Sequence, residues 1–118
     1  MPTTPEHRAK AENNEFLVDT LENPFWDWAI NGVFYAALHY VEAYFASRVP
    51  AVHPSTHTIR DNHIHRDKTL KPIYVDYRQL EDESRNARYD AGMKFTQSDV
   101  GMARGCLDRI KKVILPLL

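Results

Sequence analysis

One stretch of the chain, residues 24–48, restricts the possible folds more than any other. Its apolar residues surround most of a helical cylinder instead of forming one stripe. They are Phe25, Trp28, Ala29, Val33, Phe34, Ala36, Ala37, Leu38, Tyr40, Val41, Tyr44 and Phe45. A helix of this kind is stable in water only when other elements cover it on several sides. The sequence therefore predicts a central helix inside a helical bundle.

The same stretch is long enough to raise the alternative of a membrane span. Asp27, Asn31, His39 and Glu42 lie within it, however, and each would lose its hydration in lipid. The start of the chain lacks the basic and apolar segments of a secretory signal, and Cys106 is the sole cysteine. We therefore expect a cytoplasmic protein without a membrane partner.

The chain has 118 residues, and only four of them are glycines. A chain of this length buries its apolar side chains in one core. Hairpin turns depend on glycine, and no internal repeat is visible, so strands are disfavoured. We expect one all-α domain over residues 1–118, with four long helices and one short one.

Proline and capping residues mark the helix ends. Thr4-Pro5 begins a polar helix, Asn23-Pro24 begins the central one, and Val49-Pro50 ends it. The expected helices span residues 5–21, 24–48, about 55–66 after Ser55 or Thr56, 72–89, and a last helix that Thr96 or Ser98 caps and Pro116 frays.

Two features of the pattern predict close contacts. Gly32 and Ala36 lie one turn apart, so a neighbouring backbone can approach the central helix at this side. The apolar residues of residues 24–48 also exceed what one small bundle easily covers, which favours a homodimer.

The distribution of charge limits the type of partner. The net charge of −1 excludes a protein that coats nucleic acid by overall charge, so a nucleic-acid site must be a local patch. Residues 1–23 carry five acidic and two basic side chains, whereas residues 91–118 carry five basic and two acidic ones. We expect the acidic start and the basic end to meet.

Two motifs resemble the signatures of the HEPN superfamily. Residues Asp27 to His39 read DWAINGVFYAALH, similar to the tyrosine-, alanine- and histidine-rich helix of that superfamily. The run from Tyr77 to Gly92, which ends SRNARYDAG, is similar to its second signature. The resemblance covers roughly residues 27–113, so we take 1–23 as an N-terminal helix and 24–113 as the core of the domain.

The resemblance implies an up-and-down bundle of four to five helices that often dimerises around a polar cleft. Many members are metal-independent ribonucleases of toxin–antitoxin or defence systems, with an arginine and a histidine in the pattern R-x(4 to 6)-H. The histidine exchanges the proton of a ribose 2′-hydroxyl while the arginine holds the phosphate. Other members bind RNA, nucleotides or a nucleotidyltransferase partner.

This sequence departs from the catalytic pattern. Arg85-Asn86 is followed by Arg88, Tyr89 and Asp90, and no histidine follows residue 65. An aspartate is a poor proton donor at neutral pH, so Asp90 is no simple replacement. Arg85 and Arg88 either form a cleft for an anion or pair with Glu81 and Asp82 on an exposed helix face.

A second match to the pattern runs from Arg60 to His65, but five residues place these two side chains about 140° apart on a helix. We therefore expect an exposed polar helix here and no catalytic pair. His57 and Arg60 are three residues apart, and the alternatives for them are phosphate binding and a structural role.

The remaining candidates each have a structural alternative. His39 either bonds to a neighbouring helix or points into the cleft beside the arginines. The spacing of His53, His57, His63 and His65 disfavours a metal site. Five aromatic residues are more typical of core and interface than of base stacking: Trp26, Trp28, Tyr35, Tyr40 and Tyr44.

Three hypotheses follow for the function. The first is a dimeric binding module for RNA or a nucleotide, which needs neither cofactor nor metal. The second is a metal-independent ribonuclease with a relocated histidine, and the third is an interaction module without a ligand. The candidate ligand-binding residues are Arg85, Arg88, Tyr89, Asp90, His57, Arg60 and His39.

Overall fold

The computed structural model describes residues 1–21 and 25–118. These residues hold five α-helices and no strand, so the expected all-α fold is confirmed. The helices are α1 (Thr4–Thr20), α2 (Trp26–Ser47), α3 (His57–Arg66), α4 (Tyr74–Tyr89) and α5 (Gln97–Ile114), with 3₁₀ turns η1 (Lys71–Ile73) and η2 (Leu115–Leu117).

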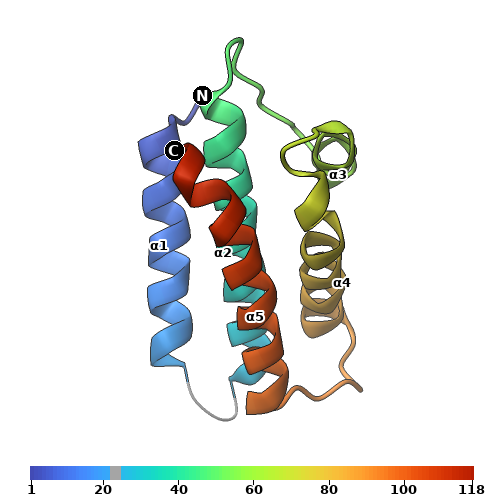
Figure 1. Ribbon diagram of the computed structural model, residues 1–118. Helices are drawn as coiled ribbons and strands as arrows, with labels where there is room; N and C mark the ends of the chain where they lie inside the picture. Colours follow the sequence, from blue (N-terminus) through green and yellow to red (C-terminus); the bar gives the residue numbers. More distant parts are fainter. Residues whose placement is uncertain (22–24) are drawn as a thin grey trace.

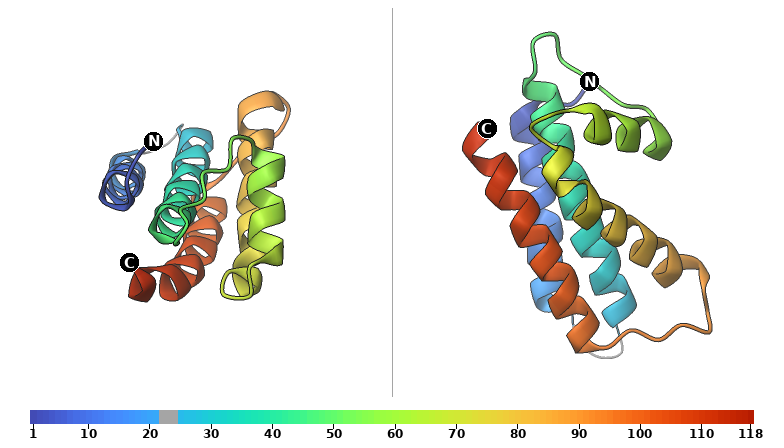
Figure 2. Two further views of the ribbon diagram at one scale, coloured as in Figure 1. Left: turned by 90° about the horizontal axis from the view of Figure 1, so that it is seen from above. Right: turned by 45° about the vertical axis from the view of Figure 1, so that its right-hand side comes forward.

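The four long helices run alternately in opposite directions (Figure 1), and the short helix α3 crosses the first turns of α4 (Figure 2). Helix α2 packs against α1, α4 and α5, as expected of the central helix. None of the described helices combines the length and hydropathy needed to cross a bilayer.

The helix starts follow the predicted type of signal, with small shifts. Thr3, and not Thr4, caps α1: its hydroxyl accepts from the backbone N–H of Glu6, whose carboxylate accepts from the Thr3 N–H. Either threonine suits a proline in the first turn, so the sequence does not distinguish them. Thr56 and Thr96 cap α3 and α5. The Asn23-Pro24 signal lies outside the described residues.

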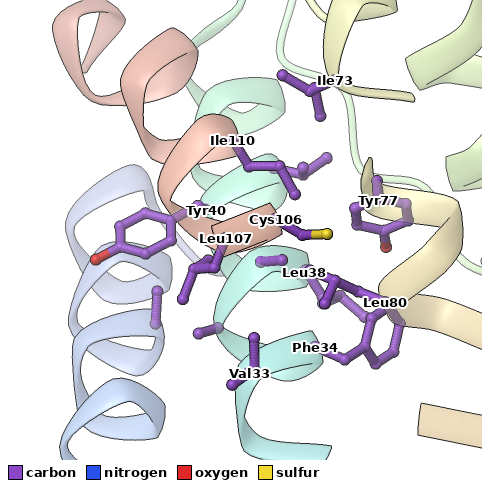
Figure 3. Packing of buried hydrophobic residues seen from close by; sticks show 14 of the residues in the cluster. Val33, Phe34, Leu38, Tyr40, Ile73, Tyr77, Leu80, Cys106, Leu107 and Ile110 are labelled. Atoms are coloured by element: carbon purple, nitrogen blue, oxygen red, sulfur yellow. The ribbon is translucent and has the colours of Figure 1, made fainter. Parts of the chain in front are cut away.

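The core surrounds α2, and 15 of the 22 residues of this helix are buried within one chain. Figure 3 shows Phe34 and Leu38 of α2 near Leu80 of α4, and Leu107 of α5 beside Tyr40 of α2. The premise of the homodimer prediction, that one bundle leaves much of this stretch uncovered, is therefore wrong. Trp28 is the largest exposed apolar side chain of α2.

Gly32 lies where α1 and α2 come closest. A Cβ atom at this position would lie 2.6 Å from Cγ2 of Val18 and 3.6 Å from the carbonyl oxygen of Asn14. The predicted close approach is confirmed, and the approaching backbone belongs to α1 of the same chain.

The acidic start of the chain meets its basic end. Glu15 of α1 pairs with Lys111 of α5 at 2.8 Å, and Asp19 pairs with Arg104 at 2.9 Å. These ion pairs confirm the expected contact, whereas α1 itself packs against α2.

Candidate functional site

The last two turns of α4 present arginines without acidic partners. Arg85 is exposed and Arg88 is half-buried. No carboxylate of the described residues lies within ion-pair distance of either side chain. The predicted alternative, in which Glu81 or Asp82 neutralises them, is not formed.

Arg78 takes those carboxylates instead. Its guanidinium lies 3.0 Å from Asp61, 3.5 Å from Glu81 and 3.6 Å from Asp82. Glu81 and Asp82 stand three and four residues after Arg78, which is the spacing of neighbours on a helix surface. The same spacing in the sequence indicates that Arg78 competes with Arg85 for these two carboxylates.

A chain of hydrogen bonds holds Arg88 against α2. Its Nη1 donates to the Tyr35 hydroxyl at 3.1 Å and to Ser84 Oγ at 2.9 Å. Ser84 Oγ lies 2.7 Å from Oδ1 of Asn31. Because a guanidinium only donates, the one hydroxyl hydrogen of Ser84 is donated to Asn31. The order Arg88, Ser84, Asn31 therefore fixes the arginine, and we call these three residues the relay.

The relay was not foreseen, although its members carry a weak signal in the sequence. Ser84 is fully buried and Asn31 is 5% exposed, and both occupy positions that face the core. A polar residue at such a position needs a partner. The sequence shows the two residues without showing that they meet, because 53 residues separate them.

The two residues after Arg88 face solvent. Tyr89 is 78% exposed, and the Arg88 guanidinium lies 5.4 Å from the centre of its ring. Asp90 follows the helix end, where its Oδ1 accepts a hydrogen bond from the Gly92 N–H at 3.0 Å. Asp90 thus stabilises the turn, and its negative charge disfavours a role in binding phosphate.

His57 begins α3 close to the same arginines. Its Nδ1 lies 3.3 Å from Nη1 of Arg60 and 3.7 Å from Oε2 of Glu81. Burial lowers the pKa of His57, the charge of Arg60 adds to the effect, and Arg88 and Arg85 contribute less. The ring is therefore neutral near pH 7, and it shares the electrostatic field of Arg85 and Arg88.

Arg60 has a structural role, one of the two alternatives predicted for it. The side chain is buried, forms an ion pair with the buried Glu42 of α2, and donates to the Pro54 carbonyl at 3.4 Å. The expected exposed polar helix is wrong on this face, since α3 packs Arg60 and Ile64 inward. His65 is exposed, so the two ends of the accidental motif lie apart as predicted.

Glu81 is a buried carboxyl group with an incomplete set of partners. Its Oε2 accepts no hydrogen bond, and the nitrogens of Arg78 and His57 lie beyond hydrogen-bonding distance at 3.5 and 3.7 Å. Burial raises the pKa of Glu81 to about 7, and the neighbouring Asp61 carboxyl adds to the shift. Desolvation thus outweighs the two weak ion pairs at this side chain.

His39 contacts α1 and not the two arginines. Its Nδ1 lies 3.1 Å from Nδ1 of His7, so one ring donates and the other accepts. Burial lowers the pKa of His39 to about 4, and the charge of His7 acts in the same direction. The alternative of a histidine bonded to a neighbouring helix is confirmed. His39 also lines a pocket of about 260 Å³ that includes Glu42 and Arg60.

A larger pocket, of about 480 Å³, opens beside the relay. Its walls come from α1, α2 and α4: Asn14, Leu17, Leu21, Trp28, Asn31, Gly32, Tyr35 and Arg88. Trp28 is 58% exposed, whereas Tyr40 and Tyr44 are buried as expected of core aromatics. Among the described residues, no three His, Cys, Asp or Glu side chains are placed to hold a metal ion.

The site lies in a chain without a recognised relative. Comparison with known protein families, curated proteins and solved structures finds no match. The HEPN resemblance therefore stays a prediction from the two sequence motifs, and the function must be argued from the residues themselves.

Proposed function

We propose that the chain is a HEPN-like binding module that holds a phosphate-bearing ligand, RNA or a nucleotide, on a cationic face. This face consists of Arg85, Arg88 and His57. One observation carries the proposal: six of the nine arginines pair with described carboxylates and Arg66 is exposed by itself on α3, whereas Arg85 and Arg88 lie three residues apart on α4 without a described carboxylate partner.

The chemistry of the face suits a phosphate group. A guanidinium donates two parallel hydrogen bonds to phosphate oxygens, and two adjacent guanidinium groups repel each other until an anion binds. Tyr35 and Ser84 already hold Arg88, so less side-chain entropy is lost when a ligand arrives. Arg85 is exposed and free to close over the anion.

The proposal includes a second copy of the chain and a biological context. The HEPN resemblance supports a homodimer with the cleft at its seam. The same resemblance supports a toxin–antitoxin or defence setting, where a nucleotidyltransferase-like protein is the expected partner.

The test compares two double variants in EDTA at two salt concentrations. Arg85→Ala with Arg88→Ala removes two charges from the face, whereas Arg66→Ala with Lys112→Ala removes two exposed charges elsewhere. We expect the first variant to weaken retention of labelled RNA at least tenfold and to reduce the salt slope by about two phosphate contacts, while the control changes little. Equal retention by both variants would contradict the proposal.

Circular dichroism and thermal melts keep this test interpretable. Arg85→Ala should leave the melting temperature unchanged, because no described residue pairs with this side chain. Arg88→Ala removes two hydrogen bonds and should cost about 1 kcal/mol, less than unfolding requires. Loss of the fold in the single Arg88 variant would make this arginine a structural residue.

A ribonuclease is the second candidate, and the position of His57 favours it. Arg60 donates to Nδ1 of the neutral ring, so a 2′-hydroxyl must replace this hydrogen bond before Nδ1 accepts its proton, while that oxygen attacks the phosphorus and the bond to the 5′-oxygen breaks. The imidazolium formed in this way can return the proton to the 5′-oxygen. The RNA would then end in a 2′,3′-cyclic phosphate.

The same EDTA assay decides between binding and cleavage. A ribonuclease yields cyclic-phosphate ends, and His57→Ala removes cleavage while retention persists. Retention of intact RNA by the wild-type chain supports the binding module and rejects the enzyme.

A further inference from the structure

The pocket beside Arg88 has the composition of a site for a planar ring. Leu17, Trp28 and Tyr35 give it apolar and aromatic walls, and its volume of about 480 Å³ falls in the range of small-molecule sites. Trp28 leaves more than half of its surface in solvent, although it lies on the most apolar helix of the chain. An exposed indole in a concave wall is a ready surface for stacking.

The side-chain amide of Asn31 in the wall of this pocket is held in one orientation by Ser84. Asn31 Oδ1 accepts from Ser84, and no described residue accepts a hydrogen bond from its Nδ2. Asn31 lines the pocket and is 5% exposed, so its amide can donate a hydrogen bond to a molecule in the pocket. The pocket thus presents a hydrogen-bond donor beside an aromatic wall.

Arg88 belongs both to this pocket and to the cationic face. A ligand that fills both must carry a planar ring with an acceptor at its edge and a phosphate within a few bonds of it. A nucleotide unit meets all of these conditions, whereas inorganic phosphate or a phosphorylated side chain meets only the last.

We propose that the pocket between α1 and α2 takes the base of a nucleotide unit, which stacks on Trp28 and accepts a hydrogen bond from Asn31 Nδ2, while its phosphate lies on Arg88 and Arg85. This inference rests on the proposed function and adds the class of ligand. The unit can come from a free nucleotide or from an unpaired nucleotide of RNA, since base-paired RNA offers no free ring.

The test titrates the full chain with adenosine 5′-monophosphate, ribose 5-phosphate and a short single-stranded adenylate oligonucleotide. Stacking of one base contributes about 1 to 3 kcal/mol, so we expect the nucleotide to bind at least fivefold more tightly than ribose 5-phosphate. Trp28→Leu should remove this difference and leave binding of ribose 5-phosphate unchanged. Phe25→Ala changes another exposed aromatic outside the pocket and should change neither affinity.

The side-chain amide of Asn31 provides a second readout that needs no variant. Its NMR resonance should shift markedly with the nucleotide and only slightly with ribose 5-phosphate, which acts on it through Arg88 and Ser84. If the oligonucleotide binds in the same Trp28-dependent manner and more tightly than the free nucleotide, RNA is the source of the unit; the reverse order indicates a free nucleotide.

Three results would overturn the inference. Equal affinities for the nucleotide and ribose 5-phosphate would leave the phosphate face intact and reject the base pocket. Binding of none of the three ligands would reject the proposed function together with the pocket. A Trp28→Leu variant that converts a dimer into a monomer, with unchanged preference for the nucleotide, would make the pocket a contact between copies.

Discussion

Arginines at the α3–α4 junction and at the end of α4 have opposite surroundings. At the junction, Arg60 is buried against Glu42, and Arg78 joins three carboxylates. About two to three turns after Arg78, Arg88 has hydroxyl groups and rings as neighbours, and neither Arg88 nor Arg85 has a described carboxylate within ion-pair distance. The same residue type therefore holds the fold together in one region and stays available for an anion in the other.

The contrast has a physical basis. A buried charge without a counter-charge costs several kcal/mol, so the junction requires its carboxylates. An exposed arginine gains little from a surface ion pair, so its lack of one carries almost no cost. Substitutions in the two regions should consequently separate effects on stability from effects on binding.

The largest expected effect follows from the junction. Arg60→Met keeps an unbranched side chain but leaves Glu42 buried without its counter-charge, which should lower the free energy of unfolding by about 3 to 5 kcal/mol. Urea unfolding measures the change, with Arg85→Met as the matched control that should stay within about 0.5 kcal/mol of wild type. A loss below 1 kcal/mol for Arg60→Met would erase the contrast between the two regions.

A smaller effect is expected at the wall of the base pocket. Gly32→Leu places side-chain atoms where Val18 Cγ2 already lies, so α1 must move and the cost should be about 1 to 3 kcal/mol. Gly101 of α5 has no atom near its missing Cβ, and Gly101→Leu should stabilise the helix by up to about 1 kcal/mol. Thermal melts that show no difference between the two variants would mean that α1 gives way easily.

The smallest expected effect concerns the charge of Glu81. The pKa of Glu81 is about 7 in the folded chain and near 4.5 when unfolded, so the folded state holds this proton more tightly. The resulting contribution to the free energy of unfolding is complete below pH 4.5 and is lost as the pH rises through 7. Glu81→Gln keeps the uncharged form and should be more stable than wild type at pH 8 by about 1 to 2 kcal/mol, with no gain at pH 4. Unfolding curves at the two pH values measure this.

Asp82→Asn is the control for Glu81, because Asp82 is exposed and lies next to it on α4. Its stability should differ little from wild type at either pH. A Glu81→Gln variant that is less stable than wild type at pH 8 would show that Glu81 is charged and that its ion pair with Arg78 is strong.

The helices were predictable because their signals are local. Proline in a first turn, threonine caps and the apolar surround of α2 act within a few residues, and Gly32 marks a close approach wherever its partner lies. The burial of Arg60 was not predictable, since α3 has almost no apolar periodicity and its packed face depends on Glu42, 18 residues earlier.

The base pocket escaped prediction for a similar reason. Its walls join three helices, and α1 has too weak an apolar stripe to show which of its residues face α2. Of the predicted ligand-binding residues, Arg85 and Arg88 act electrostatically on His57 and lower its pKa slightly, whereas Arg60 and His39 line a separate pocket near the start of the chain. The grouping depends on tertiary contacts that helical spacing does not contain.

The relay has a thermodynamic consequence for how a ligand would bind. Ser84 has one hydroxyl hydrogen, so the orientation of the Asn31 amide and the position of Arg88 depend on each other. An acceptor that fixes the Asn31 amide also restricts the Arg88 side chain, so Arg88 loses less conformational entropy when a phosphate binds to it. A nucleoside and a phosphate ion, added as separate molecules, should therefore show positive cooperativity, and by linkage each raises the affinity for the other by the same factor.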